Sequence, residues 1–515
     1  MSSTTARPST IPSGRLPVAT LVAGCAAVFL AQIGLVWPAA INGVIQVAFR
    51  ASGAQLSWVS DAFLVPIAMT SLTFGVLGDR YGRKKMLVGG AIAMALGYLV
   101  SALAGTVQLL WVGQAICGVG AAALFASSLT MITAATPEPG RRARALAAWT
   151  TALSTGALAA PVLSGAVVEI TSISWAFAFV GVIALVIAVL CAVLARESSA
   201  PEGRALDWPG QISIALALLA LLFAVIEGPA LGWGSPLVIA SFVLAVLLLV
   251  AFVRIEQRSP APMLRLGLFR IPAFSASAAV AVVGMFGFLG GAYVLSIRLG
   301  VIAHLSPLAA AVPFVIVQGV TPFIWPVLAR LLQRFGPRPM LVTGLVSLAV
   351  SHLWLRALPA TDTALPPMLP SLVLMGLGFG LVVCALTAAA VNAVPVSHAG
   401  MASGTTNMVR DLGQTLGPAI IGTVALSQAG TLLGGSLAVS GLPAAQLGVA
   451  QGVLAAGGPL ALATAPLGPL STTVAPLART ALTSGYDAGL LVTAIACLAA
   501  AVIAAVLVRG GQTPA

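Results

Sequence analysis

The stretch Gly75-Val-Leu-Gly-Asp-Arg-Tyr-Gly-Arg-Lys-Lys-Met-Leu87 decides the fold class of this chain. It places five charged residues and three glycines between two long apolar runs, in a chain of which only 7% is charged. A soluble protein has little reason for such an arrangement, whereas a short basic turn between two membrane helices explains it. The stretch therefore predicts a membrane helix before it and another after it.

The composition of the whole chain agrees with this interpretation. It is 59% hydrophobic, with a mean hydropathy of +1.08, whereas soluble proteins carry roughly 25% charged residues. Apolar runs of about 20 residues recur along the chain, and lipid forces such runs to be helical because it cannot satisfy backbone hydrogen bonds. The formal charge of +12 falls in short loops, where it sets orientation in the membrane. We therefore expect membrane lipids as neighbours and no nucleic-acid partner.

Fourteen membrane spans can be drawn along the sequence. They cover residues 18–41, 56–77, 86–105, 108–132, 146–168, 175–195, 209–228, 236–253, 272–297, 307–329, 339–356, 368–392, 408–428 and 487–508. With a cytoplasmic N-terminus, 20 of the 24 Lys and Arg residues fall on the cytoplasmic side. Cytoplasmic loops carry such an excess, so both termini are expected inside.

An internal repeat divides the chain. Residues 329–338 echo residues 75–84, with Gln333 at the place of Asp79, 254 residues later. Two adjoining six-helix halves would give a shorter offset, and the surplus matches the helix pair at 209–253. We therefore expect an all-α membrane fold in three parts, with a flexible or membrane-apposed outside loop in the last. The parts are residues 1–195, 196–270 and 271–515, and the loop is residues 429–485.

The fifth span adds a second motif, with Gly156, Pro161 and Gly165 in the pattern G-x-x-x-A-P-x-x-S-G. Together with the Gly75–Lys85 turn, it makes the chain resemble the drug/proton antiporters of the major facilitator superfamily, in their fourteen-span branch. In that family this helix is kinked and packs on helix 8 of the core. Ordinary helix packing without any exporter meaning is the alternative.

The resemblance implies a function. It implies secondary-active efflux of small amphipathic compounds, as in multidrug and antibiotic resistance, in exchange for protons by alternating access. The high Ala, Gly and Arg content suggests a bacterial cell (inner) membrane. A dedicated exporter of one self-made metabolite or of a lipid is the alternative, and a non-transporting sensor or membrane enzyme is a third.

The usual proton site of the family is incomplete in this chain. Phe29 stands where the first span commonly carries Asp, and Gln114 and Cys117 replace the Arg and Gln of the fourth span. Asp61 in the second span is the best remaining proton carrier, because an ionisable residue inside a membrane is functional by default. Asp61 could instead be an exposed residue at the start of a helix, with Asp411 or Glu227 next in line.

The basic turn is predicted to be a gate. By resemblance, Asp79 contacts the N-terminus of span 13, expected near Arg410 and Asp411, and holds the inside closed. The alternative is that the turn only sets topology. The gating residues are Gly75, Asp79, Arg80, Gly82, Arg83 and Lys84 in the first half, and Arg334, Gly336, Arg410 and Asp411 in the second.

Apolar and aromatic side chains are expected to line a central substrate cavity. Arg298 could meet an anionic substrate there, or it could extend toward the membrane surface. Core packing is the alternative for the uncharged residues. The candidates are Trp37, Asp61, Met285, Phe286, Arg298 and Trp325.

Other chemistry has little support in the sequence. The five cysteines lie in apolar runs without C-x-x-C spacing, and the three histidines are scattered, so we expect no disulfide and no metal site. No G-x-x-x-x-G-K-[ST] motif is present, which excludes an ATP-driven pump of that type. We expect no cofactor, a monomer, and small-molecule substrates and protons as the partners.

Overall fold

The computed structural model describes residues 18–508, apart from 137, 200–206, 260–261, 263, 265, 360–361, 395–398 and 466. In this part of the chain every regular element is a helix. The first part contains α1 (Val18–Ala40), α2 (Asn42–Phe49), α3 (Gly53–Tyr81), α4 (Arg83–Ala102), α5 (Val107–Ala135), α6 (Pro139–Ile170) and α7 (Ile173–Leu194). The middle part contains α8 (Trp208–Leu231) and α9 (Pro236–Arg258).

The last part contains the second bundle. Its elements are η1 (Leu266–Arg270), α10 (Pro272–Ile297), the π-helical turn η2 (Arg298–Ile302), α11 (Pro307–Phe335), α12 (Pro337–Ala357), α13 (Leu365–Asn392), α14 (Ala399–Ala438), α15 (Ala444–Thr464), η4 (Gly468–Leu470) and α16 (Ser471–Leu507). Thirteen helices in the described residues are long and apolar enough to span a membrane. The α3 helix, bent by 54° between Ser71 and Thr73, makes a fourteenth. The expected all-α membrane fold is confirmed.

The repeat seen in the sequence extends to helix packing. A Cβ atom on Gly90 of α4 would lie 2.8 Å from the carbonyl oxygen of Gly120 on α5. A Cβ atom on Gly344 of α12, 254 residues after Gly90, would lie 3.0 Å from the carbonyl oxygen of Gly378 on α13. Small residues let membrane helices approach this closely, and both bundles use them at the same place.

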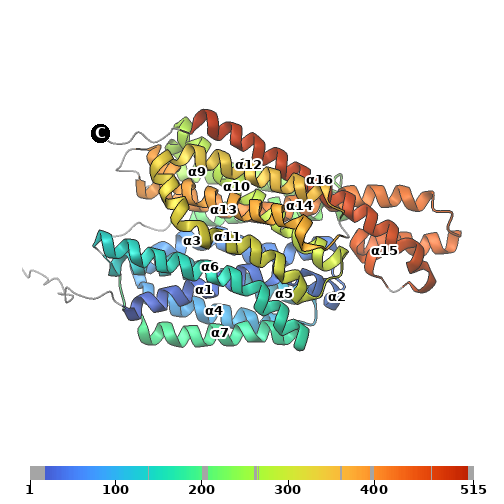
Figure 1. Cartoon of the computed structure of the whole chain (residues 1–515), viewed down its shortest axis with the longest axis horizontal. Coiled ribbons are helices and arrows are strands. Elements are labelled where there is room, and N and C mark those ends of the chain that lie inside the picture. The colour runs from blue at the N-terminus through green and yellow to red at the C-terminus, as the bar shows by residue number, and fades with distance from the viewer. Residues whose placement is uncertain are drawn as a thin grey trace, which may run out of the picture.

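The two bundles lie side by side, as Figure 1 shows. They contact each other through α6 with α11 and through α3 with α14. The inserted helices α8 and α9 pack on each other, and α8 also packs on α3 and α14. The inserted pair is therefore attached where the two bundles meet.

The expected loop at 429–485 is wrong in its conformation. The α14 helix continues to Ala438, α15 covers Ala444–Thr464, and α16 begins at Ser471. Figure 1 shows these segments projecting beyond one end of the bundle. Ala and Leu favour helix, so this segment forms α15 and extends α14 and α16. It does so although it lacks the charge pattern of an amphipathic surface helix. A positive φ of 71° at Gly458, just before Pro459, bends α15 near its middle.

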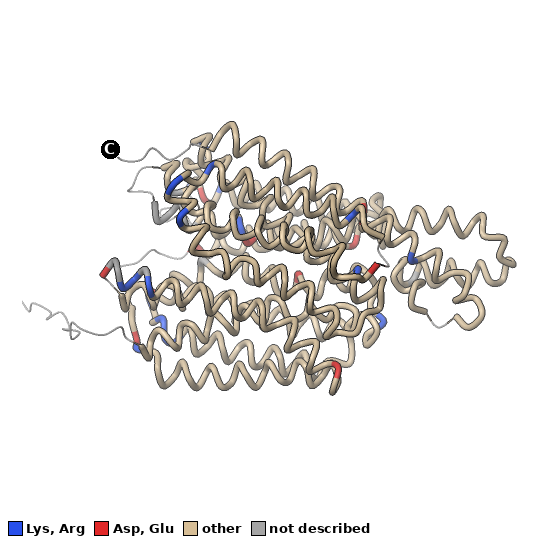
Figure 2. The backbone as a smooth tube through the Cα atoms, viewed as in Figure 1, with Lys and Arg blue, Asp and Glu red and all other residues tan. Residues whose placement is uncertain are grey.

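The charged residues distinguish the two ends of the molecule. Figure 2 shows Lys and Arg gathered at the end where α1 begins and α16 ends. That end also carries the turns after α3 and α11, and we call it the basic end. The end that carries α2 and α15 is called the opposite end. Such an asymmetry is typical of cytoplasmic and external faces.

Candidate functional site

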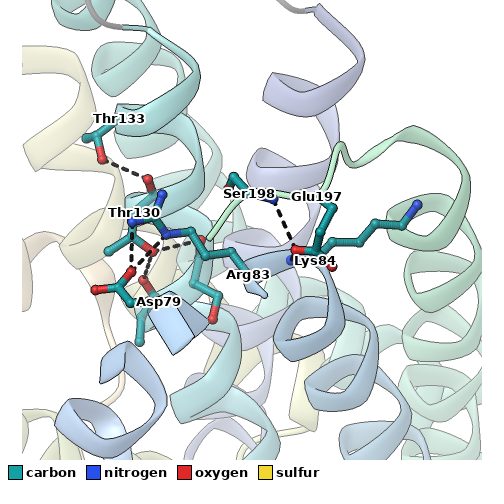
Figure 3. A network of polar contacts seen from close by, with 9 residues as sticks. Asp79, Arg83, Lys84, Thr130, Thr133, Glu197 and Ser198 are labelled. Carbon is teal, nitrogen blue, oxygen red and sulfur yellow. Dashed lines mark hydrogen bonds and ion pairs between the residues drawn. The ribbon is translucent and has the colours of Figure 1, made fainter. Parts of the chain in front are cut away.

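The turn after α3 is held by one ion pair. Its Gly82 has a φ of 113°, which a side chain tolerates poorly, and this residue ends α3 directly before α4. The Asp79 carboxylate accepts hydrogen bonds from Nε and Nη2 of Arg83 at 3.0 and 2.7 Å (Figure 3). In this conformation Asp79 is therefore bound within its own turn.

A residue that the sequence analysis missed supports this turn. Glu197, in the linker after α7, accepts a hydrogen bond from the backbone N–H of Lys84 at 3.1 Å (Figure 3). The backbone N–H of Arg83 donates to the carbonyl oxygen of Ser198 at 3.0 Å. The linker thereby satisfies two of the N–H groups that every helix N-terminus leaves unpaired. No local pattern could reveal a partner 113 residues away.

The equivalent turn after α11 also contains a glycine with a positive φ. Gly336 has a φ of 74° and ends α11 directly before α12. The guanidinium of Arg334 lies 5.3 Å from the ring centre of Phe335, as that of Arg80 lies 5.6 Å from the ring of Tyr81. The repeat is thus a structural one.

Arg410 and Asp411 bind each other, with Nε and Nη2 of Arg410 at 3.2 and 3.0 Å from Asp411 Oδ1. They were expected at the start of span 13, and this is wrong because α14 already begins at Ala399, three helical turns earlier. The linker residues 395–398 lie outside the described residues. Whether Asp79 meets the start of α14 in another conformation stays a prediction.

At the opposite end the two bundles are in close contact. A Cβ atom on Gly43 of α2 would lie 2.7 Å from the carbonyl oxygen of Gly300 in η2. Ser296 of α10 donates a hydrogen bond to the carbonyl oxygen of Ala39 in α1. Backbones this close leave no path between the bundles at these contacts, so the opposite end is closed there.

The motif on α6 lets this helix approach one helix of each bundle. A Cβ atom on Gly165 would lie 2.8 Å from the carbonyl oxygen of Pro307, at the start of α11. A Cβ atom on Gly156 would lie 2.6 Å from the carbonyl oxygen of Phe29 in α1. Pro161 stands between them, inside the helix. The α6 helix packs on α11, the place that the family resemblance implied for it.

Asp61 lies in the interface between the bundles. It is fully buried, and neither carboxylate oxygen has a hydrogen-bond partner among the described residues. This excludes the alternative of an exposed residue at a helix start. One turn before it on the same face of α3, the hydroxyl of Ser57 lies 3.1 Å from that of Tyr293 on α10. Asp61 is close enough to Tyr293 for the two to interact electrostatically. A buried acid without a partner is costly, which makes Asp61 a candidate functional residue.

Two cavity candidates occupy different places on α10. Met285 is on the face of α10 that carries Ser296 three turns later, and that face meets α1 of the first bundle. Phe286 is on the side next to α14, where its carbonyl oxygen approaches Gly417. Both side chains are buried. Trp325 on α11 is partly buried.

Two other candidates lie elsewhere. Trp37 is fully buried and stacks on Phe179 of α7 at 6.3 Å between ring centres, inside the first bundle. Arg298 is only 3% exposed, and its guanidinium donates to the carbonyl oxygen of Leu355 at 2.8 Å and to that of Pro359. It therefore binds the last turn of α12 and the segment that follows this helix. Its guanidinium is engaged with backbone carbonyls at the opposite end, which does not fit a role facing an anionic substrate in a central cavity and agrees with extension toward that end.

A cavity of about 460 Å³ lies at the opposite end. It is bounded by the α2–α3 turn, the α4–α5 loop and Gly457 of α15. Arg50, Ser52 and Thr106 make its lining polar. It differs in place and polarity from the apolar central cavity that the sequence predicts.

Comparison with known proteins places these features in a family. A model of the Major Facilitator Superfamily matches residues 22–418. The chain is 27% identical to the tetracenomycin C resistance and export protein of Streptomyces glaucescens, over 83% of this chain and 79% of that protein. It is 28% identical to the multidrug efflux pump LfrA of Mycolicibacterium smegmatis, over 73% of this chain and 74% of that pump.

Among solved structures, the fold is similar to that of a bacterial homologue of the human lysosomal transporter Spinster in an inward-facing, unoccupied conformation. The TM-score is 0.67 at 17% identity, and the match covers 96% of this chain and 98% of that one. At this identity the likeness concerns the fold alone. It agrees with the helix arrangement described above.

Proposed function

The chain belongs to the Major Facilitator Superfamily and is a multi-pass membrane transporter, not an enzyme; from this we propose that it exports small amphipathic compounds in exchange for protons. Alternating access would move the cargo, with the two bundles rocking about a central site. The names of the relatives support export, since they include a multidrug efflux pump and an antibiotic export protein.

One observation carries the proton part of the proposal, namely the burial of Asp61 without a partner between the bundles. A carboxyl group there can be charged only when water or a cation reaches it, so its protonation would follow the opening and closing of the interface. Asp61 would take a proton when the opposite end opens and release it when the basic end opens. The first span offers no acid for this role, since its position 29 is Phe, and this leaves the role to Asp61.

The cargo would bind in the apolar space between the bundles, near Met285 and Trp325, whereas Phe286 lies next to α14 within the second bundle. A flexible thioether and aromatic rings suit compounds that share apolar surface but not shape. The absence of an acid at position 29 favours monocationic, neutral or anionic cargo. The excess of Lys and Arg at the basic end supports a cytoplasmic location of both termini, in a bacterial inner membrane.

The test is the variant Asp61→Asn in proteoliposomes with an imposed pH gradient, assayed with monocationic, neutral and anionic amphipathic dyes. The amide holds a fixed neutral form, so gradient-driven export should fall to the background level while dye still binds. Asp411→Asn tests the next candidate carrier, because Asp411 is also buried but already has Arg410 as partner. Normal pumping by Asp61→Asn would show that coupling resides in another group or that the protein is a uniporter.

A second function is favoured by one comparison. The relative from Streptomyces glaucescens is named for resistance to and export of a single antibiotic. A dedicated exporter of one self-made compound would use the same fold and the same proton site. Competition between unrelated dyes in the vesicle assay distinguishes the two, since a dedicated exporter transports one chemical class only.

A further inference from the structure

The inserted helix α8 covers the line along which the two bundles meet. Leu222 and Ile226 of α8 form one buried apolar cluster with Ala54 and Val65 of α3 and Ala419 of α14. The cluster thus joins the inserted pair, the first bundle and the second bundle in one small core. An insertion that only lengthened the chain would not need to bury side chains at this seam.

Hydrogen bonds at the same place join three helices. Ser57 of α3 lies against Gly422 of α14, where an added Cβ atom would be 2.7 Å from the Ser57 hydroxyl. The next residue on each helix is bound to α8. The indole N–H of Trp58 donates to Glu227 at 2.9 Å, and the hydroxyl of Thr423 donates to the carbonyl oxygen of Val225 at 2.7 Å. Opening of the interface at Ser57 and Gly422 must therefore break one of these two bonds.

The attachment of α8 to α3 is the more directional of the two, because it has two side-chain hydrogen bonds. Besides the Trp58–Glu227 bond, the buried hydroxyl of Thr73 donates to Gln211 at 2.5 Å. Gln211 and Glu227 are 16 residues apart, about 24 Å along a helix, so the two bonds fix both the position and the direction of α8. Trp58 and Thr73 also belong to different arms of the bent α3, and α8 spans the bend.

The attachment of α8 to α14 has fewer directional contacts. Besides donating the Thr423 bond, α14 meets α8 through apolar side chains. Leu412 and Met408 pack near the N-terminal half of α8, and Leu416 and Ala419 pack near its C-terminal half. Apolar contacts are not directional and allow surfaces to slide, whereas a hydrogen bond to a backbone carbonyl does not. The Thr423–Val225 bond is thus a directional contact that a movement of the second bundle away from α8 would lose.

We propose that α8 moves with the first bundle as one body, and that the Thr423–Val225 contact holds the opposite end closed until the second bundle leaves it. Glu227 and Gln211 are then positioning residues, which act on transport through α3. The part about transport rests on the proposed function, whereas the part about movement does not. Glu227 acts as a hydrogen-bond acceptor and carries no proton in this scheme.

Cross-linking tests which contact is released. In a variant without the five native cysteines, one pair of new cysteines replaces Thr73 and Gln211, and a second pair replaces Val225 and Thr423. A short reagent that joins two thiols should leave transport by the α3–α8 pair within about twofold of the unlinked variant. The same reagent should abolish transport by the α8–α14 pair, and a cleavable linker should restore it. Blocked transport with the first link, or normal transport with the second, would overturn the proposal.

Spin labels measure the movement without any cargo. Gln108 on α5 and Ala357 on α12 are exposed at the opposite end and lie on different bundles. In the variant Thr423→Val, the population of molecules with a long distance between the labels should rise roughly fivefold relative to the population with a short distance. This is the effect of one lost hydrogen bond. Glu227→Gln retains an acceptor oxygen and should stay within about twofold of the wild type, whereas Glu227→Leu should broaden the distances. An unchanged distribution in Thr423→Val would contradict the proposal.

The two measurements separate the possible failures. If the wild type transports none of the dyes but the spin-label distances respond as expected, only the proposed function falls. If Glu227→Gln abolishes proton-coupled export while its distances remain normal, Glu227 carries a proton and its positioning role is wrong.

Discussion

The turn after α3 and the turn after α11 share a backbone and differ in charge. Each ends a helix at a glycine with positive φ, after an arginine that lies over the ring of the next residue. Only the first turn has an acid, Asp79, bound by an arginine four residues later, whereas the second has Gln333 and Pro337 at these places. The two turns therefore share a backbone conformation, but among the described residues only the first contains an ion pair.

The first helical position of each following helix shows a further difference. Arg83 has a backbone N–H, and the carbonyl oxygen of Ser198 accepts from it. Pro337 has no N–H and needs no acceptor, since proline suits the first turn of a helix. The first turn is therefore tied to a distant linker, whereas the first residue of α12 needs no such tie.

The largest expected effect comes from Asp79→Asn. The amide keeps the size of the side chain but loses the charge that Arg83 binds, and a hydrogen bond to a charged group contributes roughly 1.5–3 kcal/mol. Transport should fall about tenfold or more while the protein stays in the membrane. Initial rates in vesicles, normalised to the amount of protein, measure this. Wild-type rates would mean that the turn only sets topology.

The next effect compares the two glycines, Gly82→Ala with Gly336→Ala. A positive φ costs a side chain about 1–3 kcal/mol at either place. At Gly82 the new Cβ atom would also lie 2.6 Å from the Glu197 carboxylate, so this variant should be the less stable one. The temperature at which the detergent-solubilised protein aggregates measures the difference. Equal losses would show that the linker moves aside without cost.

A smaller effect is expected from Glu197. Glu197→Ala removes the acceptor from the backbone N–H of Lys84, which for a helix cap costs about 1 kcal/mol. Glu197→Gln keeps an acceptor oxygen and is the matched control. Hydrogen exchange at the first residues of α4 should become faster in the alanine variant and change little in the glutamine variant. Unchanged exchange in both would remove the linker from the support of this turn.

The smallest effect is expected from giving the second turn the charge of the first. In Gln333→Asp the new carboxylate has an uncharged proline at position 337 instead of an arginine. Transport should therefore stay within about twofold of the wild type. Adding Pro337→Arg would restore the pair four residues apart, and the coupling between the two substitutions should be about 0.5 kcal/mol in favour of the pair, although the loss of the buried proline itself destabilises the turn. Denaturation curves of the single and double variants measure the coupling. A large loss of transport in Gln333→Asp would show that the second turn also has a partner that moves.

Several features of the chain followed from the sequence alone. The number of spans, the turn at Asp79 and its echo at Gln333 are local patterns of apolar length, charge and glycine. Such patterns act over a few neighbouring residues, and lipid leaves helices as the only choice for the apolar runs. The packing of α6 on α11 was implied by the family motif at Gly156 and Gly165.

Other features were decided only by the tertiary structure. The burial of Asp61, the capping of α12 by Arg298, the support of the turn by Glu197 and the bonds of α8 at the bundle interface all join residues far apart in the chain. The sequence of an apolar helix is the same whether its polar side chain faces lipid, water or another helix. The surroundings of that side chain therefore cannot be predicted from the sequence. Residues 429–485 were misjudged for a related reason, because helices rich in Ala, Gly and Leu show no amphipathic period. The sequence therefore determined which segments are helices in a membrane, and the packing of the two bundles decided which of their few polar groups are buried without a partner.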